Sequence, residues 1–171
     1  NWHKVPFKND AGVPEVFIPN GPQGGNNGRN DGGYMSEFSQ GPLRIGDELI
    51  YYYSSSSWGK NAPSDKRIFG GGIFRARLRV DGFVSVVGGT LTTKPLAITG
   101  RDLFVNAVGP VSVSVLAGDG KVLGETSIVG DSLRHQVRFG GRTLADLAGE
   151  GPVRLRFTVA PPGHLYSFTV R

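Results

Sequence analysis

Three arginines at alternate positions have the type and spacing to bind an anion. Arg75, Arg77 and Arg79 alternate with apolar residues in the segment Phe74–Val80, which is the period of a β-strand with one polar and one apolar face. Guanidinium groups bind carboxylates and sulfates through paired hydrogen bonds, so this stripe is a candidate site for the acid groups of an acidic polysaccharide. The alternative is that these side chains pair with Asp and Glu on neighbouring strands, or are simply solvated.

Aromatic residues offer a second kind of binding chemistry. Tyr34, the run Tyr51–Tyr53 and Trp58 could form a platform on which sugar rings stack. Consecutive residues of a strand point to opposite faces, so at least one tyrosine of the run must point into a core. Trp58, in a Ser-Trp-Gly loop, is the better candidate for contact with a ligand.

Other kinds of chemistry are excluded by what the sequence lacks. Without cysteines, the chain has no disulfides, thiolate metal sites or cysteine nucleophiles. His3, His135 and His164 are scattered, with no two at metal-ligand spacing, and no Gly-x-Ser-x-Gly elbow of a serine hydrolase occurs. Gly70–Gly72 precedes a strand pattern instead of the helix that a phosphate-binding loop requires. We therefore expect no cofactor and no bound metal.

The charge of the chain is unevenly distributed. Its 171 residues include 19 Lys and Arg and 14 Asp and Glu, for a net charge of +5, and the excess lies in residues 61–171, because residues 1–60 hold five basic and six acidic residues. A basic domain favours nucleic acid, an anionic membrane or an acidic polysaccharide. The basic residues are spread along strand patterns, no nucleic-acid-binding motif is present and no apolar run approaches 18 residues. We expect neither nucleic acid nor a membrane as a partner.

The residues that must position these groups form short strands separated by turns. With 27 glycines and 11 prolines, the chain favours many turns and few long helices. Leu43–Ile45, the turn Gly46-Asp47 and Glu48–Tyr53 predict one hairpin. Ile73–Val80, the turn Asp81-Gly82 and the segment 83–87 predict another, with the strongest hairpin signal in the chain.

From residue 89 onward, strand patterns recur every eight to twelve residues with glycine or aspartate turns between them, as in a β-sandwich or jelly roll. The predicted strands are Gly89–Thr93, Leu96–Ile98, Leu103–Ala107, Val111–Leu116, Thr126–Val129, Arg134–Phe139, Val153–Val159 and His164–Val170. Only Thr143–Ala148, followed by Gly149, suggests helix, for about one turn. The fold class is therefore all-β.

We expect two parts, residues 1–87 and residues 88–171. The second is long enough to form its own core, whereas two or three hairpins cannot bury a sheet face alone. The start Asn1–Lys4, without a methionine or a leader, also suggests a piece of a longer polypeptide, the alternative being a complete mature protein. The predicted apolar core is Phe74, Leu78, Val80, Leu103, Val105, Val111, Val113, Val115, Val137, Phe139, Leu155, Phe157, Phe168 and Val170.

Several segments of the sequence resemble those of a known family. Those in the first part are Phe17–Pro22, the glycine-rich loop with Asp31–Gly33, Gly41–Tyr53 and Arg79–Ser85. They resemble the last blades of bacterial five-bladed β-propeller glycoside hydrolases of the fructosidase and arabinanase type. Those in the second part are similar to the β-sandwich appended to such propellers: Gly89–Pro95, Leu103–Asn106, Gly130–Ser132, Pro152–Phe157 and Leu165–Phe168. The resemblance implies terminal propeller-blade strands over 1–87 and a jelly-roll-like sandwich over 88–171.

The same resemblance implies a function and a site. The chain would be the C-terminal portion of an exported glycoside hydrolase-like or glycan-binding protein, extracellular or periplasmic, contributing a pocket rim and a supporting sandwich. Asp31 and Glu37 are its candidate catalytic carboxylates; the alternatives are a turn residue and a solvated strand residue, respectively. The partners would be carbohydrate and the missing propeller portion or a partner chain. Two carboxylates on one blade do not make an active site, so the chain alone is not expected to be catalytic. The alternative function is a non-enzymatic sandwich module for adhesion or assembly.

Overall fold

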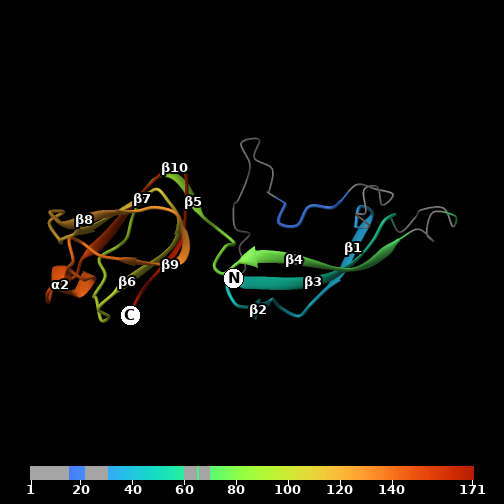
Figure 1. Ribbon diagram of the computed structural model, residues 1–171, viewed down its shortest axis with the longest axis horizontal. Coiled ribbons are helices and arrows are strands. Elements are labelled where there is room, and N and C mark those ends of the chain that lie inside the picture. The colour runs from blue at the N-terminus through green and yellow to red at the C-terminus, as the bar shows by residue number, and fades with distance from the viewer. Residues whose placement is uncertain (1–15, 22–30, 60–64, 66–69) are drawn as a thin grey trace. The chain divides into compact units, whose positions relative to one another are not determined.

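A computed structural model describes residues 16–21, 31–59, 65 and 70–171. The chain is all-β, as predicted, and divides into two compact units, Asn1–Arg77 and Leu78–Arg171 (Figure 1). This division falls ten residues before the boundary expected at residue 87. Among the described residues, no helix is long and apolar enough to cross a membrane.

The first unit is built on one central strand, β3 (Glu48–Ser56). Strands β1 (Tyr34–Phe38) and β2 (Leu43–Ile45) pair with it antiparallel, one after the other along the same edge. The predicted hairpin is confirmed: β2 and β3 are joined at Gly46, whose φ of +60° suits glycine. Strand β4 (Gly71–Arg79) also pairs with β3. It takes the other edge, because Gly71 lies against Ser55 and Ser56, where β1 already occupies the first edge.

The second predicted hairpin is wrong, although its turn exists. The Gly82 N–H donates to the Arg79 carbonyl at 2.8 Å, and Asp81 has a φ of +59°. However, the strand that follows, β5 (Val86–Thr92), pairs with residues 156–165 and not with β4. A local turn signal reverses the chain but does not decide which strand becomes the hydrogen-bonding partner.

The second unit is one strongly curled sheet (Figure 1). Its longest strand, β10 (Arg154–Val170), pairs with several of the others. The strand order is β8-β7-β10-β6-β9, with β5 also paired to β10. The other bounds are β6 Leu103–Val108, β7 Val111–Leu116, β8 Val122–Ile128 and β9 Asp131–Val137. The first part of β10 pairs with β7 and the last with β6. The two strands predicted at 153–159 and 164–170 are therefore the arms of one strand.

The arms of β10 meet at Ala160–Gly163. Pro161 and Pro162 lack the N–H that a ladder requires, so regular pairing is interrupted there. A Cβ on Gly163 would lie 2.7 Å from the carbonyl oxygens of both Ala160 and Pro110, so only glycine permits this close approach. The interruption lets the sheet turn back and enclose a core.

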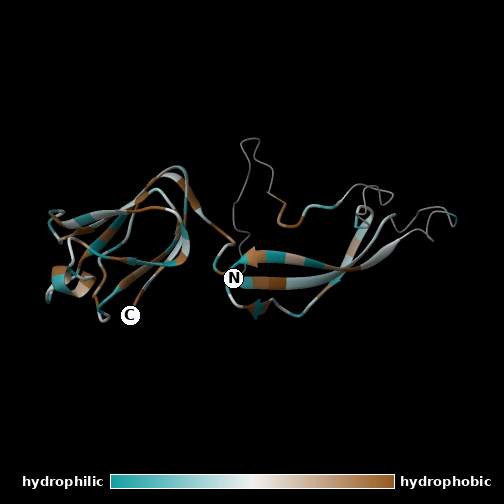
Figure 2. Ribbon diagram, in the orientation of Figure 1, coloured by the Kyte–Doolittle hydropathy of each residue, from teal (hydrophilic) through white to brown (hydrophobic). Residues whose placement is uncertain are grey.

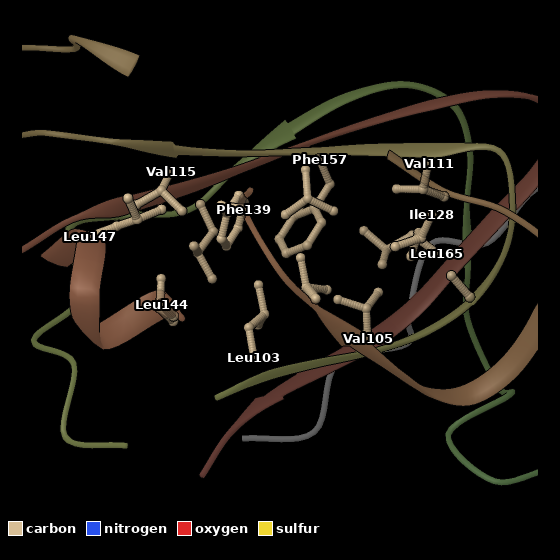
Figure 3. Close-up of a cluster of buried hydrophobic side chains, with 14 of the residues drawn as sticks. Leu103, Val105, Val111, Val115, Ile128, Phe139, Leu144, Leu147, Phe157 and Leu165 are labelled. Carbon is tan, nitrogen blue, oxygen red and sulfur yellow. The ribbon is translucent and has the colours of Figure 1, made fainter. Parts of the chain in front are cut away.

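That core is formed by inward side chains of the curled sheet and by one short helix (Figure 3). Helix α2 (Leu144–Ala148) is the predicted turn; Thr143 and Asp146 cap it reciprocally, and Leu144 and Leu147 are buried. The predicted core is confirmed at Leu103, Val105, Val111, Val113, Val115, Val137, Phe139, Leu155 and Phe157. Phe168 and Val170 only pack against the cluster half-buried. The prediction missed Ala107, Leu116, Ile128, Leu144, Leu147, Val153, Val159 and Leu165 in the second unit, and Ile50 and Tyr53 in the first.

The apolar face predicted for β4 is only half-buried. Phe74, Ala76 and Leu78 are less exposed than Arg75 and Arg77 between them, and Figure 2 shows the corresponding alternation of hydropathy along the strand. The period of two was therefore right, but Phe74, Leu78 and Val80 do not join the main core.

Substitution of Phe157 tests how much the core of the second unit contributes to stability. Its side chain is 0% exposed and stacks on Phe168 with ring centroids 5.3 Å apart. We expect Phe157→Ala to lower the free energy of unfolding by about 3–5 kcal/mol, because it removes a buried ring and leaves a cavity. Thr169→Ser, at an exposed position of the same strand, should change it by less than about 0.5 kcal/mol. Urea denaturation followed by circular dichroism measures both, and equal effects would contradict this packing.

Candidate functional site

The two faces of the first sheet carry different chemistry. On one face the ring of Tyr53 stacks on Phe38 from β1 and on Phe74 from β4, with centroids 5.6 Å apart in both pairs. These three residues form what we call the aromatic row. Side chains alternate along a strand, so Tyr52 and Ser54, the neighbours of Tyr53, point to the opposite face. By the same rule, so does Ile73 beside Phe74.

We call this opposite face the groove face; a shallow depression of about 240 Å³ lies in this part of the sheet, lined by residues of both faces. Of its lining residues, Tyr52, Ser54 and Ile73 have side chains on the groove face by the alternation just described, and Glu37 joins them through its hydrogen bond from Ser54. Its full lining is Glu37, Phe38, Ser39, Tyr52, Tyr53, Ser54 and Ile73. The depression thus brings together a carboxylate, a hydroxyl, an aromatic ring and an aliphatic side chain from three strands.

Two serine hydroxyls hold the Glu37 carboxylate. Ser36 and Ser54 each donate to Oε2 of Glu37 at 2.5 Å, and their own oxygens are 2.7 Å apart. A bulge between Met35 and Phe38 interrupts the register of β1 with β3. The bulge lets the adjacent residues Ser36 and Glu37 both reach Ser54, which a regular strand would not allow.

These hydrogen bonds favour the ionised form of Glu37. The bond from Ser36, then that from Ser54, then a backbone bond lower its pKa from 4.5 to about 2. At neutral pH the group is a carboxylate fixed in position. It can accept hydrogen bonds or face a cation, but a group of this pKa does not hold the proton that a general acid must donate.

Asp31, the other predicted catalytic carboxylate, belongs to the aromatic-row side. Its Oδ2 accepts a hydrogen bond of 3.0 Å from the Tyr53 hydroxyl, while Oδ1 is buried without a partner among the described residues. Glu37 is bonded to Ser54, whose side chain leaves β3 on the other face. The described structure therefore does not bring Asp31 and Glu37 together, as the carboxyl pair of a glycosidase would require. Their catalytic roles remain predictions.

Of the two predicted aromatic ligands, Tyr34 lies on the groove face by its register, and Trp58 follows the end of β3. Tyr34 is opposite Ser56 in the register, hence on the same face as Ser54, and is 48% exposed. Trp58 is half-buried at the end of β3, where its backbone packs against Gly33 so closely that an added Cβ would lie 2.2 Å from the Trp58 carbonyl carbon. Neither Tyr34 nor Trp58 is among the residues that line the depression.

The three arginines of the stripe have different environments. Arg77 is 3.6 Å from Glu48 on β3, within the first unit. Arg79 is 2.5 Å from Asp131, and these two residues belong to the second unit. Arg75 is exposed and has no ion pair with any described residue. Two of the three therefore pair with acidic residues, Arg77 with one on the neighbouring strand β3 and Arg79 with one on β9. Ligand binding by the stripe stays a prediction.

Arg79 is further fixed by Asn106, a buried residue of β6. Nε of Arg79 donates to Oδ1 of Asn106 at 2.6 Å, and Nδ2 of Asn106 donates to the Val80 carbonyl at 2.8 Å. The guanidinium also lies over the ring of Tyr166, 5.0 Å from its centroid. These contacts fasten the start of the second unit to its sheet, which is a structural role.

Within the described residues there is no cluster of three or more potential metal ligands. His135 lies 3.1 Å from the Ala107 carbonyl and His164 lies 3.1 Å from the Ser85 hydroxyl, so both are engaged in the second unit. His3 is outside the described residues.

Sequence analysis missed Ser36 and Ser54 and singled out Tyr52 only as one of the three tyrosines. Alternation along Glu48–Ser56 places Tyr52 and Ser54 on one face, and that signal was available. The bulge that brings Ser36 to Ser54 has no comparable sequence signal. Comparison of the chain with protein-family models, with curated proteins and with solved structures finds no match.

The serines test the origin of the low pKa of Glu37. We expect Ser36→Ala and Ser54→Ala each to raise it from about 2 toward 4.5, because each removes a hydrogen bond that favours the carboxylate. The wild-type carboxylate should stay ionised as the pH falls below 4.5 and take up its proton only near pH 2. Titration of the Glu37 side-chain carbonyl by NMR measures this. An unchanged pKa in the double variant would contradict the geometry, and Ser39→Ala is the control.

Substitution of Asn106 tests whether its hydrogen bonds with Arg79 and Val80 stabilise the second unit. Asn106→Ala should lower the free energy of unfolding by about 1–3 kcal/mol, because it leaves the Val80 carbonyl and Nε of Arg79 without partners. Gln136→Ala, exposed on the neighbouring strand β9, should have little effect. Since both tryptophans lie in the first unit, unfolding is best followed by circular dichroism and by hydrogen exchange of amides in the second unit. Equal stability of the two variants would show that Asn106 is dispensable.

Proposed function

We propose that this chain binds carbohydrate along the groove face of its first sheet. The observation that carries the proposal is the placement of two exposed tyrosines, Tyr34 and Tyr52, on one face with an ionised carboxylate, Glu37, between them. Stacking rings and fixed polar groups are the two contacts that sugars need.

The tyrosines supply the apolar contacts. Tyr34 is 48% and Tyr52 38% exposed, so each presents ring surface on which the C–H groups of a pyranose can pack. Tyr34 lies opposite Ser56, four residues along β3 from Tyr52. At the rise of a β-strand this is about 13 Å. The face therefore suits an extended oligosaccharide better than a single sugar.

Glu37 supplies directional hydrogen bonding. Its Oε2 is occupied by Ser36 and Ser54, which orient the group, and Oε1 has no hydrogen bond with a described residue. A carboxylate accepting from a sugar hydroxyl makes a charge-assisted hydrogen bond, which is stronger than a neutral one. Because the group is already oriented, binding loses little side-chain entropy.

Binding is better supported than hydrolysis. Asp31 takes its hydrogen bond from a residue of the aromatic row, on the other face from Glu37, and Glu37 is not protonated at neutral pH. The kinship with propeller glycoside hydrolases and the location outside the cell remain predictions that accord with a glycan ligand.

Screening of the 171-residue chain on a glycan array, followed by calorimetry with the glycans that bind, tests this function. We expect Tyr52→Ala and Glu37→Gln each to weaken binding about tenfold, the equivalent of one stacking contact or one charged hydrogen bond. Tyr52→Phe keeps the ring and should bind nearly as the wild type.

Glu150→Gln, in an exposed position of the second unit, is the charge control and should bind normally. The absence of any glycan ligand, or equal affinity of the wild type, Tyr52→Ala and Glu37→Gln, would refute the proposed function.

A further inference from the structure

Arg75 lies beside Tyr52 on the groove face. Phe74 of β4 stacks on Tyr53 of β3, Gly71 lies against Ser55 and Ser56, and Arg77 reaches Glu48. The two strands are therefore antiparallel with Phe74 opposite Tyr53. The next residue of β4, Arg75, comes opposite Tyr52, and both point away from the aromatic row.

Among the described residues, no acidic group pairs with Arg75, unlike the two other arginines of the strand. Arg77 is paired with Glu48 and Arg79 with Asp131, whereas exposed Arg75 has no ion-pair partner among the described residues. A guanidinium beside an exposed ring is a ready site for a carboxylate, which it can bind through two parallel hydrogen bonds.

We propose that the ligand of the groove face is a uronate-containing glycan, with a sugar ring on Tyr52, its carboxylate on Arg75 and hydroxyl groups of the chain on Glu37. The inference rests on the proposed function and specifies its substrate class. Of the three arginines suggested by the sequence, it assigns ligand binding to Arg75 alone.

The opposite charges on the face select this class of ligand. Glu37 lies on β1 and Arg75 on β4, the two neighbours of β3, so about 10 Å, two strand spacings, separate their backbones. A ligand must present hydroxyl donors at one side and an acid at the other. A densely anionic chain, such as a nucleic acid or a heavily sulfated glycan, would also place negative charge against Glu37. A neutral glycan would leave Arg75 unused.

Calorimetry with the full chain tests the inference, using oligomers of galacturonate, mannuronate and glucuronate together with their carboxyl-reduced neutral forms. We expect at least one uronate oligomer to bind at least about tenfold more tightly than its reduced form, the equivalent of one charged hydrogen bond. Arg75→Gln should abolish this preference without changing the affinity for the reduced form. Arg75→Lys should retain part of it, since it keeps the charge but not the paired geometry.

Arg44→Gln is the matched control. It removes the same charge from the same sheet, but Arg44 lies opposite Leu49, on the other face from Tyr52. Equal losses in Arg75→Gln and Arg44→Gln would show attraction by net charge only and overturn the inference. Equal affinity of the wild type for uronates and their reduced forms would overturn it while leaving the proposed function intact. Failure to bind any glycan would refute both.

Discussion

The two-residue alternation of the central strand β3 is the constraint on which the candidate site depends. Tyr53 and Ser54 are adjacent in the chain, yet one completes a stack of three rings and the other holds a carboxylate on the opposite face. A shift of β3 by one residue against its neighbours would exchange the two faces. Stacking of Phe38 and Phe74 on Tyr53 opposes such a shift, so the aromatic row keeps the groove face in register.

In the second unit, the constraint is the burial of the apolar face of a single sheet. Its sheet buries its apolar side chains by turning back on itself at the Pro161–Gly163 interruption of β10, and α2 closes the core with Leu144 and Leu147. Arg79 belongs to this unit through Asn106 and Asp131. A residue that resembles part of a ligand-binding stripe in the sequence therefore serves to anchor the chain.

Much of the local structure was predictable and much of the pairing was not. Turn-forming residues and alternation located most strands, the turn at Gly46 and the helix after Thr143. They did not predict β1, and the strand expected at Leu96–Ile98 is only an isolated bridge at Leu96. The segment after Asp81-Gly82 was expected to fold back on β4 but pairs with β10, about 70 residues later. The strands at 153–159 and 164–170 were expected to be separate and form one. The Tyr34 placement followed from register alone, and the Ser36–Glu37–Ser54 cluster depended on a bulge without a sequence signal.

The sequence by itself determined where most strands and turns fall and which side chains of a regular strand share a face, because both follow from the geometry of a few neighbouring residues. The tertiary structure decided which strands pair and in what register. It thereby decided that Arg77 and Arg79 have ion-pair partners while Arg75 has none among the described residues, and that Asp31 and Glu37 belong to opposite faces. The physical reason is that an ion pair or a hydrogen bond across strands depends on residues far apart in the chain, whose proximity no local pattern encodes.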